Sequence, residues 1–139
     1  MQIQRIQTLF LLIAVALVGV FCFTPFAQAT AEDGSVSHVF VKDTPVLLVV
    51  NICIAVLLFL NIFMYRNLRR QMKLTLVSML LLAGSAVACG MVVTVGMPDA
   101  SLLWTGGVLL LLLALVMAVF AYRGMSRDKR KLASLDRIR

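Results

Sequence analysis

Three cysteines are the side chains of this chain that could carry redox chemistry. Cys22, Cys53 and Cys89 stand singly, in three separate apolar segments. Membrane thiol oxidases and quinone-coupled reductases use paired thiols such as C-x-x-C. At about 1.5 Å per residue, Cys53 and Cys89 would lie roughly 12 and 10 Å below the outer ends of their helices, so their depths permit a pairing. Because burial disfavours the reactive thiolate, a thiol-redox enzyme remains the less favoured alternative.

The single histidine, His38, could serve as a metal ligand or as a general base. Its acidic neighbours are Glu32, Asp33 and Asp43, but no H-x-x-x-H or E-x-x-H spacing accompanies them. None of the apolar segments contains a histidine that could hold a haem iron. We therefore assign no catalytic residue, no metal site and no cofactor.

Two asparagines are the most polar side chains within the apolar segments. Asn51 and Asn61 are ten residues apart, which places them about 80° apart around a helix. Pumps, proton relays and ion channels normally carry ionisable groups at membrane depth, and these segments have none. We expect an interhelical hydrogen bond from Asn51; a substrate contact is the alternative and would indicate a small transporter.

The elements that must position these residues are four long apolar segments without charged residues or histidine. Roughly 20 apolar residues cross a hydrocarbon core of about 30 Å. With 62% hydrophobic and 14% charged residues, the chain is no ordinary soluble domain, and 139 residues leave no room for a separate soluble one. The sequence predicts an all-α polytopic membrane protein, a bundle of four transmembrane helices, with spans at about 7–26, 45–65, 74–96 and 102–122.

The basic residues lie almost entirely on one side of these spans. Twelve of the 13 Lys and Arg residues flank the spans on that side, and Lys42 is the exception. Because cytoplasmic loops collect Lys and Arg, we expect both termini, the loop 66–73 and the basic tail 123–139 in the cytoplasm, and the loop 27–44 outside. The twelve residues are named here the basic surface: Arg5, Arg66, Arg69, Arg70, Lys73, Arg123, Arg127, Lys129, Arg130, Lys131, Arg137 and Arg139.

The expected counter-charge of the basic surface is the anionic headgroup of a lipid. A nucleic-acid partner is not expected, because the basic residues flank apolar spans and are not interleaved with stacking aromatics. In the tail, Leu132, Leu135 and Ile138 recur every three residues. This spacing predicts a short helix lying on the inner leaflet. A docking site for a cytoplasmic partner is the alternative.

The first span has a rival interpretation as a cleaved secretory signal. Ala27-Gln28-Ala29 matches the small-x-small pattern of cleavage sites. The apolar run from Ile6 to Phe23 is 18 residues long, whereas signal cores usually have about 7 to 15. We expect a retained span and keep cleavage as the alternative.

Small residues on the third span predict close helix packing. Helices in lipid associate where small side chains let their backbones approach, and we therefore expect the third helix to be central in the bundle. A tight turn over 96–101 would join spans three and four into a hairpin, with Asp99 or Ser101 capping the fourth helix. Asn51 and five residues of span three are the predicted packing residues: Gly84, Ser85, Ala88, Cys89 and Gly90.

The outer loop 27–44 has no clear structural signal. Residues 36–41 alternate weakly, in a pattern too mixed to establish a buried strand face. Arg5 and the pair Asp136-Arg137 fall on the same side of the membrane, so an ion pair or a shared contact could link the two termini.

Both ends of the chain resemble a known family. The opening Ile3-Gln4-Arg5-Ile6-Gln7-Thr8, the Lys42-Asp43 pair, and Asp128 with the run 132–139 are similar to small four-helix inner-membrane proteins of Bacteroidota, catalogued as domain of unknown function 4293. The resemblance implies four helices and a bacterial inner (cytoplasmic) membrane. It supplies no catalytic residue, substrate or cofactor.

The function that these observations favour is non-enzymatic. We expect an accessory subunit or scaffold that works through contacts with a membrane-protein partner or a second copy. A small transporter or lipid-handling protein is the alternative, followed by the thiol-redox enzyme.

Overall fold

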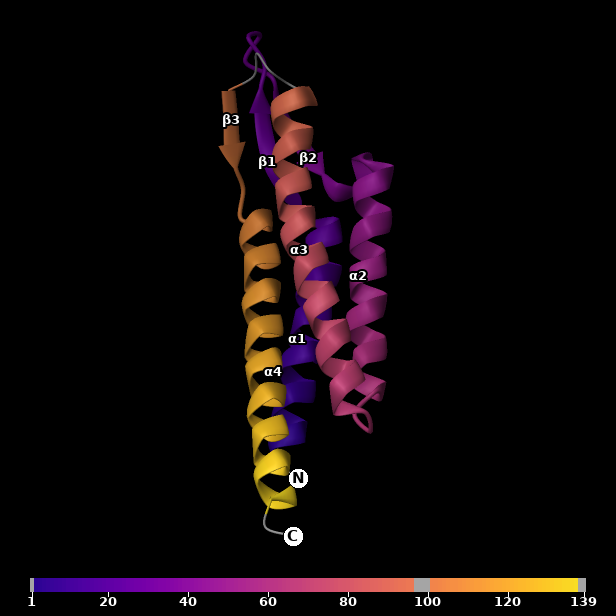
Figure 1. The fold of residues 1–139 in the computed structure, drawn as a ribbon. Coiled ribbons are helices and arrows are strands. Elements are labelled where there is room, and N and C mark those ends of the chain that lie inside the picture. The colour runs from indigo at the N-terminus through magenta and orange to yellow at the C-terminus, as the bar shows by residue number, and fades with distance from the viewer. Residues whose placement is uncertain (1, 97–100, 138–139) are drawn as a thin grey trace.

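A computed structural model describes residues 2–96 and 101–137, with side chains for residues 5–96 and 103–137. The chain forms four long helices, a three-stranded sheet and one short 3₁₀ turn (Figure 1). The elements in chain order are α1 (Gln2–Phe23), β1 (Pro25–Thr30), β2 (Val36–Phe40), η1 (Val41–Asp43), α2 (Pro45–Phe63), α3 (Leu68–Gly96), β3 (Ser101–Trp104) and α4 (Gly107–Asp136).

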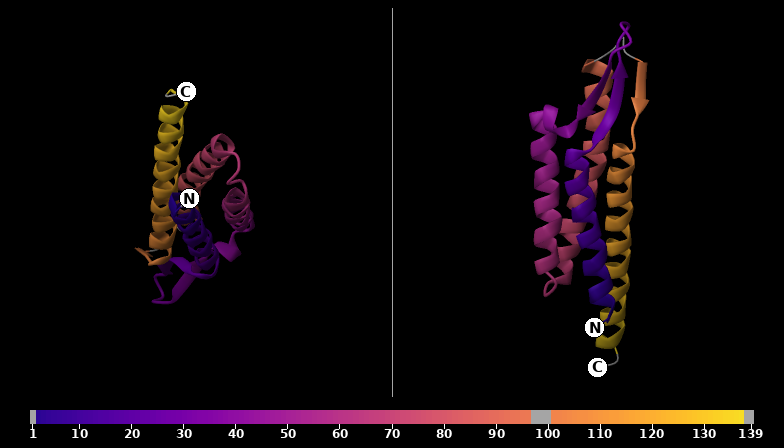
Figure 2. Two further views of the ribbon diagram at one scale, coloured as in Figure 1. Left: turned by 90° about the horizontal axis from the view of Figure 1, so that it is seen from below. Right: turned by 180° about the vertical axis from the view of Figure 1, so that it is seen from behind.

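The four helices form an antiparallel bundle in which each helix has two neighbours. Helix α1 packs against α2 and α4, and α3 packs against the same two helices from the other side (Figures 1 and 2). The predicted central position of the third helix is therefore wrong. Its buried positions, such as Ser78, Leu82, Ser85 and Cys89, recur every three or four residues and form one face only.

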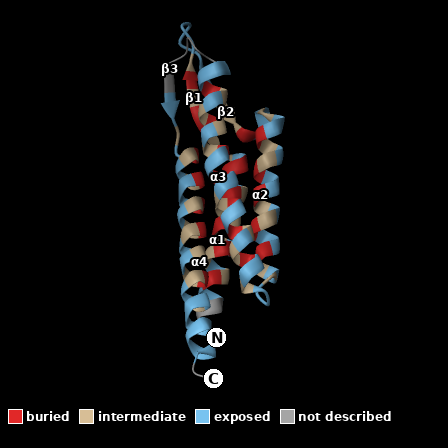
Figure 3. Ribbon diagram, in the orientation of Figure 1, coloured by how far each residue is buried: buried red, intermediate tan, exposed pale blue. Residues whose placement is uncertain are grey.

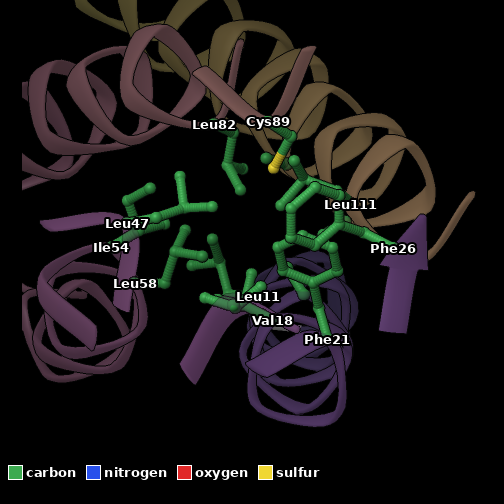
Figure 4. Close-up of a cluster of buried hydrophobic side chains, with 14 of the residues drawn as sticks. Leu11, Val18, Phe21, Phe26, Leu47, Ile54, Leu58, Leu82, Cys89 and Leu111 are labelled. Atoms are coloured by element: carbon green, nitrogen blue, oxygen red, sulfur yellow. The ribbon is translucent and has the colours of Figure 1, made fainter. Parts of the chain in front are cut away.

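The bundle interior holds both apolar and polar side chains. Figure 4 shows the apolar cluster, to which α1 contributes Leu11 and Val18, α2 contributes Leu58, α3 contributes Leu82 and α4 contributes Leu111. The outward faces are rich in exposed leucine, valine and phenylalanine (Figure 3). Among the residues whose side chains the structure describes, seven polar ones are buried in the core: Gln7, Asn51, Asn61, Gln71, Thr75, Ser78 and Ser85.

An apolar exterior around a partly polar interior suits a lipid environment, in which a leucine loses nothing by facing outward. Among the described residues, four helices are long and apolar enough to cross a membrane. The predicted fold class is confirmed: this is a multi-pass, all-α four-helix bundle.

The two longest helices extend beyond the length that a membrane requires. Helix α3 has 29 residues and α4 has 30, about 45 Å each, against a hydrocarbon core of about 30 Å. The expected loop 66–73 is therefore helical from Leu68 onward. The predicted separate helix in the tail is wrong, because α4 runs without a break to Asp136. Ile138, which that prediction also used, lies outside the described residues.

The expected outer loop 27–44 is largely a sheet. Strand β1 is central and pairs antiparallel with β2 on one side and β3 on the other, in the order β2-β1-β3. The hairpin turns at Gly34, whose φ of 78° suits a residue without Cβ. The first span therefore ends as a helix at Phe23, earlier than the predicted 26.

The fourth span also begins later than predicted, because residues 101–104 belong to β3. Ser101 does not cap α4, whose N-cap is Gly106, and Asp99 lies outside the described residues. The start of α4 is tied to β1 instead. The Thr105 amide donates to the carbonyl of Phe26 at 3.2 Å, and the Thr105 hydroxyl donates to the carbonyl of Pro25.

Candidate functional site

The three cysteines are all free, and they differ in exposure. Cys53 is exposed on α2, whereas Cys22 and Cys89 are buried. Cys89 points into the core beside Leu82 (Figure 4). Although Cys53 and Cys89 were expected at similar depths, Cys53 is exposed and Cys89 is buried, so the two thiols do not share one buried site.

His38 lies on strand β2, where it is exposed and pairs with Gln28 of β1 across the sheet. Its ring is 6.5 Å from the ring of Phe40. Within the part of the chain that the structure describes, no three His, Cys, Asp or Glu side chains converge as metal ligands would.

Asn51 is wholly buried between α2 and α3. Its amide nitrogen lies 2.8 Å from the carbonyl oxygen of Leu47 and 3.0 Å from the hydroxyl of Ser85, and that hydroxyl lies 3.2 Å from the amide oxygen. The interhelical hydrogen bond that the sequence predicts for Asn51 is present. It uses Ser85, another of the predicted packing residues.

A second buried polar cluster lies nearer the other end of the same two helices. The side-chain amide of Asn61 donates to the Thr75 hydroxyl at 2.7 Å. The side-chain amide of Gln71 donates to the backbone carbonyl of Asn61 at 3.4 Å. The Thr75 hydroxyl lies 2.9 Å from the Gln71 carbonyl and 3.7 Å from the sulfur of Met125 on α4. These bonds join α2, α3 and α4 by polar contacts.

The outward side of α2 and α3 carries a groove of about 310 Å³, named here the α2–α3 groove. Gly84 and Ala88 of α3 line it, and a Cβ added at Gly84 would meet nothing within 4 Å. The polar side chain that α3 contributes to the lining is Ser85, which is buried. Most of the lining is apolar: Val46, Leu47, Val50, Leu80, Leu81 and Val92, with Thr44.

The residues of the basic surface lie at one end of the bundle. Both described chain ends and the α2–α3 connection are at that end, opposite the sheet (Figures 1 and 2). The first turns of α3 carry Arg69, Arg70 and Lys73, and all three are exposed. The end of α4 carries the exposed residues Arg123, Arg127, Lys129 and Arg130. Arg139 lies outside the described residues.

A second groove opens between α1 and α4 at this basic end and is named here the α1–α4 groove. Its volume is about 490 Å³. Phe10 and Phe120 contribute an aromatic pair with ring centroids 5.8 Å apart. The other lining residues are Ile6, Gln7, Arg123, Gly124, Arg127, Asp128 and Lys131.

The two ends of the chain are linked in this groove by a hydrogen bond. The amide of Gln7, which is 3% exposed, donates to the half-buried carboxylate of Asp128. Gly124 permits the approach, because a Cβ there would lie 3.0 Å from the Gln7 side chain. Among the described residues Arg5 makes no ion pair with Asp136, so the contact expected between the termini is made by other residues.

The sequence prediction did not single out several of these residues. Gln7 and Gln71 stand at the basic margins of their spans, where a polar residue is unremarkable, so nothing local marks them as buried. Phe10 and Phe120 meet only because α1 and α4 are neighbours. Polarity is the signal that could have identified Gln7 and Gln71, because most of the polar residues described in the apolar helices are buried.

Comparison with protein families gives one result. A family model described as Domain of unknown function (DUF4293) matches residues 3–138. Comparison with curated proteins and with solved structures finds no match.

Proposed function

We propose that this protein, which belongs to the DUF4293 family, is a non-enzymatic accessory subunit or scaffold of a bacterial inner membrane. It would act by offering the α2–α3 groove to a transmembrane helix of another membrane protein. The observation that carries the proposal is the exposed Gly84 that lines an apolar groove between helices long enough to span a membrane.

The lining of the α2–α3 groove supports a helix as its occupant. Gly84 and Ala88 are four residues apart on α3, so one small side chain stands a turn above the other. Small residues at this spacing let a second helix approach closely in lipid, where association depends on packing and not on a hydrophobic driving force. The α3 residues that line the groove extend from Leu80 to Val92, about 18 Å or more than three turns of helix.

The buried polar groups support a structural role over transport. Asn51 is 0% exposed and bonds to Leu47 and Ser85, so its amide is engaged in holding α2 to α3. Asn61 and Thr75 bond to each other in the same way. A small transporter, the alternative function, would need such groups to face a substrate path.

The proposed orientation places the basic surface in the cytoplasm. Cytoplasmic segments next to membrane spans carry an excess of Lys and Arg, and the sheet end carries Lys42 as its cation. With both termini at the basic end, the sheet of β1, β2 and β3 would lie outside. Lys42 lies there over the ring of Phe40, 4.5 Å from its centroid.

The test is a pull-down whose result depends on the groove. The tagged protein is extracted in mild detergent, and co-purifying chains are counted by native mass spectrometry. We expect a stoichiometric partner with the wild type and its loss in Gly84→Leu and Ala88→Leu, whose side chains fill the groove.

The matched control is Gly19→Leu on α1. Gly19 also has nothing within 4 Å of an added Cβ, but it lies outside the α2–α3 groove. This variant should keep the partner. The proposal fails if the wild type is a monomer without a partner chain, if groove-filling leaves the complex intact, or if the mass lost on filling the α2–α3 groove is that of a lipid.

A further inference from the structure

The geometry points to a binding site for an anionic glycerophospholipid in the α1–α4 groove. The lipid phosphate would lie against Arg123, Arg127 and Lys131, and an acyl chain would lie along Phe10 and Phe120. This inference does not rest on the proposed function, because the α2–α3 groove lies on different helices and none of its residues is shared.

The basic half of the groove is built by one side of α4. Arg123, Arg127 and Lys131 are spaced four residues apart, so they follow one another along a single face of the helix. Among the residues that the structure describes, none of the three forms an ion pair. They are cations that line a concave surface without an anion.

Asp128 is the acidic residue of the lining, and it is already engaged. Its carboxylate accepts a hydrogen bond from the buried amide of Gln7, which fixes it against α1. Three cations against this one carboxylate leave the groove with a positive charge. Basic pockets between transmembrane helices at a membrane surface are typical binding sites for anionic headgroups.

The apolar half of the groove selects an amphiphile over free phosphate. Phe10 and Phe120 lie 5.8 Å apart between ring centroids, and Ile6 lines the groove beside them. Along α4 the groove passes from Phe120, the last turn of the uncharged run, to Lys131 in the charged segment. A phospholipid changes from acyl chain to phosphate in the same direction, whereas inorganic phosphate would use only the basic half.

The experiment compares lipids and variants in one titration. The detergent-purified full chain is titrated with phosphatidylglycerol or with zwitterionic phosphatidylcholine, and bound lipid is counted by native mass spectrometry. Each basic residue near an anionic surface contributes about fivefold to the binding constant, which is roughly 1 kcal/mol. We expect the triple variant Arg123→Gln, Arg127→Gln and Lys131→Gln to lose about 100-fold in phosphatidylglycerol affinity.

The matched control removes the same charge elsewhere in the tail. The triple variant Lys129→Gln, Arg130→Gln and Arg137→Gln changes three exposed cations that do not line the groove. We expect it to bind phosphatidylglycerol within a few-fold of the wild type. An equal loss in both triple variants would show only general attraction to negative charge and would overturn the site.

Two further measurements keep the inference testable if a triple variant folds poorly. Asp128→Asn removes the groove's negative charge while keeping an oxygen for Gln7, so it should bind phosphatidylglycerol about fivefold more tightly. Phe10→Ala should weaken the binding of phosphatidylglycerol and leave the affinity for inorganic phosphate unchanged. The inference is wrong if Asp128→Asn has no effect, if phosphatidylcholine binds equally well, or if inorganic phosphate displaces the lipid at similar concentration.

Discussion

The side-chain amide of Asn61 on α2 donates to the hydroxyl of Thr75 on α3 at 2.7 Å, while the amide oxygen of Asn61 is buried without a hydrogen-bond partner among the described residues. Thr75 therefore provides the hydrogen-bond acceptor for the NH₂ group of this buried side chain. Since an unsatisfied polar group is costly away from water, the pair makes the packing of α2 on α3 depend on one hydroxyl.

Replacing Thr75 by valine should test this dependence. Thr75→Val keeps the shape of the side chain and removes the acceptor, so the Asn61 amide loses its partner as well. We expect the free energy of unfolding to fall by about 1 to 3 kcal/mol, measured by equilibrium unfolding in mixed detergent micelles.

The matched control for Thr75→Val is Ser78→Ala on the same helix. The Ser78 hydroxyl bonds to the carbonyl of Leu74 within α3 and to no other helix. Its removal leaves no amide on another helix without a partner among the described residues, so it should cost only about 0.5 to 1 kcal/mol. Equal losses in the two variants would mean that the bond to Asn61 adds nothing.

Two adjacent glycines at the start of α4 should respond differently to alanine. A Cβ on Gly107 would collide with the backbone carbonyl of Pro25, whereas a Cβ on Gly106 would meet nothing within 4 Å. Because backbone cannot yield as a flexible side chain can, Gly107→Ala should lower the free energy of unfolding by about 1 to 3 kcal/mol. Gly106→Ala should be close to neutral.

Thermal unfolding of the two alanine variants in the same detergent makes this comparison. The contact concerns the junction of β1 with α4, so Gly107→Ala should also speed amide hydrogen exchange in the sheet. If Gly106→Ala and Gly107→Ala unfold at the same temperature, α4 does not pack on β1 as closely as the structure has it.

The number of long helices follows directly from the sequence, whereas their ends follow only in part. A chain in lipid must satisfy its backbone hydrogen bonds internally, so a long uncharged apolar run indicates a helix. Which face of each helix is buried does not follow in the same way. Leu82 is buried and Leu80 is 67% exposed, yet both are leucines two residues apart; hydropathy cannot distinguish a side chain that faces lipid from one that faces the core.

Polar side chains carry the information that hydropathy lacks. Asn51, Ser85 and Thr75 are all buried, and each faces a neighbouring helix. The expectation of a central third helix is wrong because Gly84 and Ala88, two of the predicted packing residues, line a groove on the outside of the bundle. Small size alone does not say on which side of a helix a partner lies.

The third strand of the sheet was missed because its pairing is not local. Strand β1 pairs with β3, so that Ala27 lies opposite Trp104 and Thr30 lies opposite Ser101. These residues are more than seventy positions apart in the chain. Residues 36–40 pair with β1 across the local turn at Gly34, but their weak alternation did not indicate a strand. The pairing of β1 with β3 depends on the bundle bringing both segments to one end.

The link between Gln7 and Asp128 should be measurable as a coupling energy. A double-mutant cycle with Gln7→Ala and Asp128→Ala isolates it. Because the bond joins a buried amide to a carboxylate, we expect a coupling of about 1.5 to 3 kcal/mol in the free energy of unfolding. A second cycle with Gln7→Ala and Lys129→Ala should be additive, since Lys129 is exposed and does not line the groove. A coupling near zero in the first cycle would show that the two ends of the chain are not tied there.

The proposed orientation makes opposite predictions for two exposed positions. Ser35 lies beside the hairpin turn at the sheet end, and Asn67 lies in the connection between α2 and α3 at the basic end. In a variant whose native cysteines are replaced by alanine, Ser35→Cys and Asn67→Cys are labelled with a membrane-impermeant maleimide in right-side-out membrane vesicles. Because Lys and Arg mark the cytoplasmic side, Ser35→Cys should react at once and Asn67→Cys only after the vesicles are permeabilised. Labelling in the reverse order would invert the orientation and place the basic surface outside. Immediate labelling of both would contradict the placement of the two ends on opposite sides of a membrane.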